Sequence, residues 1–106
     1  MSTNIQRLLA ELKLRLVELY GERLTAIYLF GSYARGDYNE SSDLDVMIVL
    51  TDYQSYSEEI DRTGEIISQL SLEYGISISR VIMKEAQWQL SDTPLLRNIR
   101  AEGVPA

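Results

Sequence analysis

The residues best suited to chemistry lie in one short stretch, where a glycine-rich turn is followed by two closely spaced aspartates. The turn, Gly31–Gly36, follows the apolar segment Ile27–Phe30, which predicts a strand that enters a tight turn and then a short helix. The unpaired N–H groups and the positive dipole end at the start of such a helix can hold phosphate. Asp43 and Asp45 stand at the start of the next apolar run, where the period of a strand places both on one face with Met47 and Val49 and turns the residues between them to the other face. The pattern predicts a phosphate-binding turn beside a carboxylate pair that can bind Mg²⁺.

The alternative is an ordinary turn followed by a solvated, acidic strand start, since Gly, Asp and Asn are common turn residues. Either half of the pattern alone fits that interpretation. Two carboxylates about 5 Å apart, however, repel each other by roughly 3 kcal/mol at an effective dielectric constant near 20. Placing Asp43 and Asp45 together is therefore unfavourable unless a cation or water relieves the repulsion, which favours the functional interpretation.

The spacing separates this site from two common kinds of nucleotide site. A Walker loop requires a lysine and a hydroxyl residue after its second glycine, whereas Gly36 is followed by Asp37 and Tyr38. A dinucleotide fingerprint requires a third glycine at the start of a long helix, which is missing. What remains is Gly-Ser, ten residues and Asp-x-Asp, a pattern that resembles the nucleotidyltransferase superfamily of the DNA polymerase β type. Ala34-Arg35-Gly36 and Ser42-Asp43 are similar to its smallest branch, the minimal nucleotidyltransferases, which are typically encoded beside a HEPN-domain partner in toxin–antitoxin pairs.

The resemblance implies a Mg²⁺-dependent enzyme that transfers AMP from ATP to a protein acceptor, a HEPN toxin, and so acts as its antitoxin. It implies that Asp43 and Asp45 are catalytic and ligate the metal, and that Ser32 and the neighbouring amides hold the terminal phosphates. Gly31 would allow the phosphates to approach the backbone closely.

Arg35 lies one turn into the expected short helix, where its guanidinium could contact phosphate. A surface ion pair with Asp37 or Glu40 is an equal alternative. Two tyrosines that flank the turn, Tyr33 and Tyr38, are weaker candidates for nucleotide contacts.

The third acid of the family is missing from this sequence. The resemblance implies a further carboxylate on the third strand, but the segment Ile76–Ile82 contains no Asp or Glu, and Ser79 stands where the acid is expected. A serine is a poor general base for a hydroxyl acceptor. Three outcomes stay open: a slow enzyme, an enzyme that borrows an acid from its acceptor, or a binding module that neutralises a HEPN partner by docking. Transfer to an aminoglycoside or to tRNA is a more remote alternative.

The composition excludes several classes of function. The chain of 106 residues has no Cys and no His, which excludes disulfides, thiolate or imidazole metal sites and a Ser-His-Asp triad. The formal charge of −6 works against direct nucleic-acid binding, because that requires a basic face. Residues 1–19 form neither a secretion signal nor a membrane span, so we expect a cytoplasmic protein whose partner is a protein or a small ligand.

The elements around the site follow from hydrophobic periodicity. We expect helices over Thr3–Tyr20, from Ser55 to Gly75 and from Pro94 to Gly103, the first with a capping box at Thr3 and Gln6, and strands over Leu24–Phe30, Leu44–Leu50 and Ile76–Met83. This order predicts an α/β (α+β) fold with a small sheet of three strands flanked by helices. The resemblance implies that the fold is a polymerase β-type palm, in which the sheet is mixed. We expect residues 1–106 to form a single nucleotidyltransferase domain.

Overall fold

The computed structural model describes residues 2–106, which form a mixed sheet with helices on both of its faces. The strands are β1 (Leu24–Phe30), β2 (Leu44–Leu50), β3 (Ile78–Lys84) and β4 (Val104–Pro105), in the spatial order β3-β2-β1-β4. The central pair β1–β2 is antiparallel, β3 runs parallel to β2, and β4 runs antiparallel to β1. The α/β class and the mixed sheet are confirmed, but the expected number of three strands is wrong. β4 has two residues, too few for any alternation to predict it.

The long helices agree with the predicted ranges, and the exceptions are the cap of α1 and one short helix, α4. They are α1 (Thr3–Tyr20), α2 (Ser32–Arg35), α3 (Tyr56–Tyr74), α4 (Glu85–Leu90) and α5 (Pro94–Glu102), with a short 3₁₀ turn, η1 (Gly21–Arg23), after α1. The cap of α1 is Ser2, whose Oγ accepts from the N–H of Ile5, rather than the expected capping box at Thr3. Ser55 caps α3 as expected. Helix α4 was not predicted, because its six residues are too few to show a helical period.

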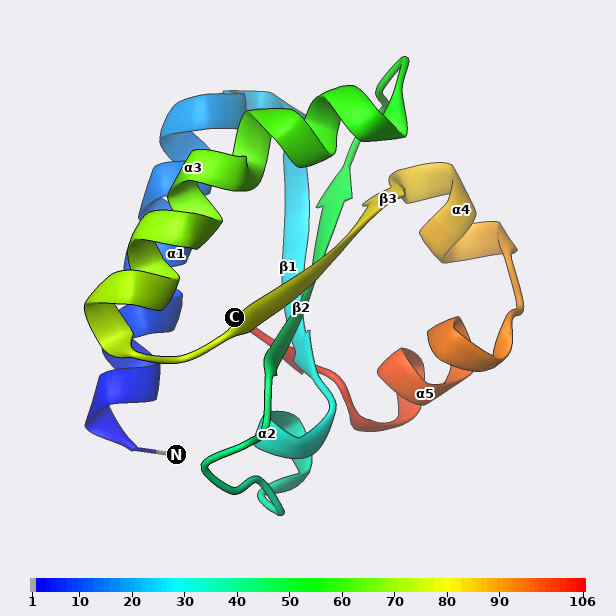
Figure 1. Ribbon diagram of the computed structural model, residues 1–106. Helices are drawn as coiled ribbons and strands as arrows, with labels where there is room; N and C mark the ends of the chain where they lie inside the picture. Colours follow the sequence, from blue (N-terminus) through cyan, green and yellow to red (C-terminus); the bar gives the residue numbers. More distant parts are fainter. Residues whose placement is uncertain (1) are drawn as a thin grey trace.

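The two faces of β2 are covered by different helices. Figure 1 shows α1 and α3 on one side of the sheet and α4 and α5 on the other. Side chains beneath α1 and α3 include Leu44, Val46, Ile48 and Leu50, whereas Met47 and Val49 pack with Leu96 and Ile99 of α5. This split confirms the alternation expected along β2. Asp45 lies two residues before Met47 in the strand and therefore points to the same side of the sheet, the side of α5.

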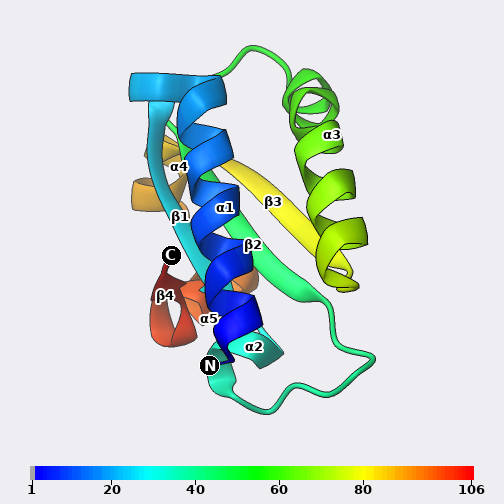
Figure 2. The same ribbon diagram turned by 90° about the vertical axis from the view of Figure 1, so that its left-hand side faces the viewer.

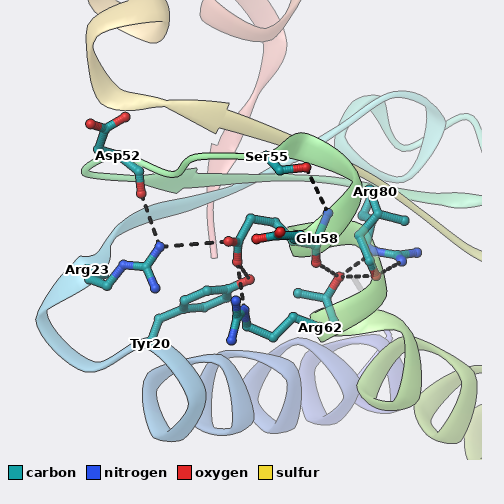
Figure 3. Close-up of polar contacts among 10 residues, drawn as sticks. Tyr20, Arg23, Asp52, Ser55, Glu58, Arg62 and Arg80 are labelled. Atoms are coloured by element: carbon teal, nitrogen blue, oxygen red, sulfur yellow. Dashed lines mark hydrogen bonds and ion pairs between the residues drawn. The ribbon is translucent and has the colours of Figure 1, made fainter.

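A buried polar cluster fastens α1, η1 and α3 at the end of β1 that is remote from the glycine turn (Figure 3). Glu59 of α3 is 2% exposed, and its Oε1 accepts hydrogen bonds from the hydroxyl of Tyr20, at 2.8 Å, and from Nε of Arg62, at 3.0 Å. Arg23 of η1 lies 3.9 Å from the other oxygen of Glu59. Burial, followed by the bond to Glu59, raises the pKa of Tyr20 above its ordinary value. A cavity of about 330 Å³ opens beside this cluster and not beside the aspartates.

None of the helices within residues 2–106 combines the length and the apolar character that a membrane-spanning helix needs.

Candidate nucleotide- and metal-binding site

The glycine turn joins the end of β1 to the four-residue helix α2. Gly31 caps α2 with a φ of 74° and a ψ of −156°, a backbone conformation that other residues rarely adopt. Its carbonyl accepts hydrogen bonds from the N–H groups of Ala34 and Arg35, both at 3.1 Å. The N–H groups that precede them have no partner within the helix, because a helix leaves its first donors unpaired. The strand, the tight turn and the short helix are confirmed, and the turn presents Ser32 and backbone donors at the end of β1. Phosphate binding by the turn stays a prediction.

The side chain of Asp45 lies directly against this turn. Asp45 pairs with Phe30 across the β1–β2 ladder, one residue before Gly31. A Cβ atom on residue 31 would clash with Oδ2 of Asp45, so only a glycine leaves room for the carboxylate. The sequence suggested that Gly31 admits phosphate, but it gave no sign that the glycine also accommodates the aspartate. The turn and the acid thus form one site.

The two aspartates differ in their surroundings. Asp43 is exposed just before β2, whereas Asp45 is partly buried at its start. Partial burial, and then the charge of Asp43, raise the pKa of Asp45 above its ordinary value, while Arg35 acts in the opposite direction. A neighbouring divalent cation would relieve both penalties on the ionised carboxylate. Carboxylate oxygens are also the donors that Mg²⁺ prefers.

The third strand brings a serine to the aspartates. In the parallel β2–β3 ladder Ser79 is the partner of Asp45, and its side chain is exposed. The next residue, Arg80, points to the α3 side, where its Nε donates to Oγ1 of Thr63 at 2.7 Å. Among the residues that the structure describes, no cluster of three or more acidic side chains is placed to hold a metal ion. The expected carboxylate of β3 is therefore not replaced by an acid from elsewhere in residues 2–106.

Arg35 forms ion pairs on both sides of its guanidinium. Nε lies 3.2 Å from Oδ2 of Asp37, and Nη1 lies 3.2 Å from Oε2 of Glu102 at the end of α5. Of the two pairings that the sequence offered, the structure contains the one with Asp37 and not the one with Glu40. The sequence gave no indication of Glu102, which is 67 residues away along the chain. Figure 2 shows the end of α5, β4 and α2 together at one end of the sheet.

The two tyrosines near the turn pack on each other. Their rings stack with centroids 4.2 Å apart and an angle of 11° between the planes. Tyr33 is buried in the cluster beneath α1 and α3, on the face of β2 opposite to Asp45, and Tyr38 stacks on its ring. We therefore interpret the pair as a brace for the loop between α2 and β2 and assign neither residue a nucleotide contact.

Comparison with known proteins identifies the class that this site defines. The family model of the nucleotidyltransferase domain matches residues 9–105. A protein of Methanocaldococcus jannaschii named "Putative protein adenylyltransferase" is 38% identical over 81 residues, which are 76% of this chain and 81% of the relative. The chain therefore belongs to the nucleotidyltransferase domain family, and it is a nucleotidyltransferase.

Solved structures share the fold at lower identity. The crystal structure of a toxin–antitoxin with AMP-PNP matches with a TM-score of 0.63 and 21% identity, over 89% of this chain and 68% of the other. A structure of the tri-AMPylated Shewanella oneidensis HEPN toxin in complex with its MNT antitoxin matches with a TM-score of 0.52 and 17% identity, over 92% of this chain and 70% of the other. These likenesses concern the fold and agree with the arrangement of helices and strands described above.

Proposed function

We propose that this chain transfers AMP from ATP to a protein acceptor, a HEPN-domain toxin, and so acts as its antitoxin. The observation that carries the proposal is the contact between the glycine turn and Asp45, because it brings a phosphate-binding segment and a metal-binding carboxylate into one site. In the reaction an acceptor hydroxyl oxygen forms a bond to the α-phosphorus of ATP. The bond from that phosphorus to the bridging oxygen breaks, pyrophosphate leaves, and the hydroxyl proton passes to a base.

Each residue of the site has a role in this proposal. Asp43 and Asp45 hold Mg²⁺, which, when bound, stabilises the charge that develops on the phosphoryl oxygens. Ser32 and the first amides of α2 hold the terminal phosphates of ATP. Arg35 contributes a guanidinium to the same phosphates. The donor set fits the metal, because Asp45 is a partly buried carboxylate beside a second one and its pKa is raised by both circumstances.

Two observations support a protein acceptor. The named relative is described as a protein adenylyltransferase, and the two solved neighbours are toxin–antitoxin structures, one of them with an AMPylated HEPN toxin. We propose that residues 1–106 act as one domain and that the partner supplies the acceptor surface.

A second function is favoured by one specific feature, the serine beside Asp45. Ser79 cannot ligate a metal as a carboxylate does and is a poor base. A chain with this site could bind the partner and neutralise it by docking, with little or no transfer of AMP. Both functions predict a complex, so they differ only in whether the partner is modified.

The test is incubation of the chain with ATP labelled on the α-phosphate, Mg²⁺ and the HEPN-domain protein encoded beside it. We expect label on the partner with the wild-type chain and none with Asp43→Asn/Asp45→Asn, while both chains bind the partner. If both chains bind and neutralise the partner without labelling it, the docking function replaces the transferase. Absence of any complex would overturn the assignment of a HEPN partner.

A further inference from the structure

We propose that Glu102 is a positioning residue for nucleotide binding, which together with Asp37 holds the guanidinium of Arg35 at the end of α2 with its Nη2 group free for phosphate. The inference rests on the proposed function, because it concerns the same MgATP site. It adds a residue from the other end of the chain, on α5, to a site otherwise built from residues 31–45.

The contacts leave part of the guanidinium available. Asp37 accepts from Nε and Glu102 accepts from Nη1. Within residues 2–106 no hydrogen bond engages Nη2, so its two N–H donors can meet a phosphate oxygen. Both carboxylates raise the pKa of Arg35, Asp37 more than Glu102, so the guanidinium keeps its charge.

The backbone on both sides of Glu102 is fixed, unlike that of most surface acids. Before it, Leu96 and Ile99 bury α5 against the sheet. After it, the N–H of Gly103 donates to the carbonyl of Ile99 at 2.7 Å, and β4 then pairs with β1 at Tyr28 and Leu29. An exposed ion pair is usually weak because two mobile side chains must be ordered. Here the packing of α5 and the pairing of β4 fix the backbone position from which the Glu102 side chain reaches Arg35.

The position of Glu102 is unfavourable for the helix itself. It is the last residue of α5, where the helix dipole is negative and a carboxylate is disfavoured. The ion pair with Arg35 offsets this charge. Because the pair lies at the surface, it adds nothing to the packing of the core. The ion pair thus offsets the unfavourable position of Glu102 and at the same time holds the guanidinium of Arg35.

The electrostatics of the site give the direction of the effect. Arg35 is the last residue of α2, and the cap of that helix, Gly31, lies against the carboxylate of Asp45. Without Glu102, the guanidinium loses one of the two anions that hold it and is drawn toward the aspartate pair, where a metal ion is expected. Arg35 would then compete with Mg²⁺ and no longer face the phosphates. Removal of Glu102 should consequently weaken MgATP binding.

The test measures the affinity of the whole chain for MgATP by calorimetry in four variants and in the wild type. Glu102→Ala should weaken binding by about fivefold, which is the upper range for one exposed ion pair. In an Arg35→Ala background, the additional change Glu102→Ala should have almost no effect, because the role of Glu102 passes through Arg35. Asp92→Ala is the matched control, since Asp92, just before the start of α5, forms an exposed ion pair with Arg97 at 2.8 Å, and the change should leave the affinity unchanged.

Three results would overturn the inference. Unchanged or tighter MgATP binding by Glu102→Ala would show that the pair does not position Arg35. An equal loss in the Arg35→Ala background would show that Glu102 acts through the stability of α5. Both results presuppose that the wild-type chain binds MgATP and so leave the proposed function intact, whereas failure of the wild-type chain to bind MgATP would remove the proposed function together with this inference.

Discussion

Replacing both aspartates by asparagine should raise the stability of the protein in the absence of Mg²⁺ and abolish its stabilisation by Mg²⁺. Without a divalent ion, Asp43 and Asp45 repel each other across two residues of extended chain, about 6.6 Å. Their repulsion is about 0.6 kcal/mol at the dielectric constant of water and about 2.5 kcal/mol at an effective value of 20. Because Asp43 is exposed and Arg35 offsets part of the charge, we expect the lower part of that range, about 0.5 to 1 kcal/mol. The variant should therefore unfold a few degrees above the wild type.

In the presence of Mg²⁺ the wild type should be more stable than the double variant. A ligand at ten times its dissociation constant stabilises the folded state by about 1.4 kcal/mol if it binds only that state. The wild-type chain should gain this amount on addition of Mg²⁺, whereas Asp43→Asn/Asp45→Asn should gain none, so that the wild type becomes the more stable protein. The assay is thermal unfolding followed by circular dichroism, with and without Mg²⁺. Asp61→Asn is the control, because Asp61 is an exposed acid on α3, away from the site.

The pH dependence of the stability gives an independent check that the charge of Asp45 destabilises the metal-free protein. The pKa of Asp45 is raised above 3.8 in the folded protein, so the folded state retains this proton to a higher pH than the unfolded chain does. Below pH 3.8 the group contributes nothing to stability, and as the pH rises through the folded pKa an unfavourable contribution develops. The single variant Asp45→Asn lacks this contribution and should gain in stability relative to the wild type over that interval. If Asp45→Asn follows the wild type at every pH and Mg²⁺ stabilises both proteins alike, the metal assignment fails.

Three further changes test other parts of the structure. Gly31→Ala should lower the free energy of unfolding by about 1 to 3 kcal/mol in urea titrations, because the alanine is strained at a positive φ. It should also abolish the stabilisation by Mg²⁺, because the new Cβ displaces the carboxylate of Asp45, and an unaffected Mg²⁺ response would refute the contact between Gly31 and Asp45. Ser79→Asp should tighten Mg²⁺ binding and raise AMP transfer by about 10²-fold or more in the labelling assay, and an unchanged rate would show that two aspartates suffice. Tyr20→Phe should destabilise the protein by about 1 to 3 kcal/mol, since it removes a donor from the buried Glu59, and yet leave MgATP affinity unchanged, because that cluster lies at the far end of β1.

The parts of the fold that the sequence predicted are those with a repeated hydrophobic signal. α1 and α3 run for 18 and 19 residues, and β1 and β2 have the predicted bounds. In β2 the alternation also predicted which side chains lie with the aspartates, because a strand turns every second residue to the same face. β3 begins at Ile78, two residues later than expected, since Ile76 and Ser77 continue the β-type composition without joining the strand.

The parts that the sequence did not predict depend on contacts between distant residues. β4 has two exposed residues and is defined by its pairing with β1. The ion pair of Arg35 with Glu102 exists because α5 and β4 return the end of the chain to the glycine turn. The fit between Gly31 and Asp45 depends on the register of β1 against β2. Patterns among residues that are close in the sequence predict none of these three features.

The register of the central strands therefore links the core to the chemistry. A slip of one residue between β1 and β2 would turn Asp45 to the face beneath α1 and α3 and put Val46 against the turn. That slip is opposed by the side chains of β2 from Val46 to Leu50, all of them fully buried between two layers of helices. The carboxylate at the edge of the sheet is thus held in place by apolar residues that touch neither nucleotide nor metal. Substitutions that loosen these residues should weaken the metal site before they unfold the chain, because the position of Asp45 depends on the register of β2.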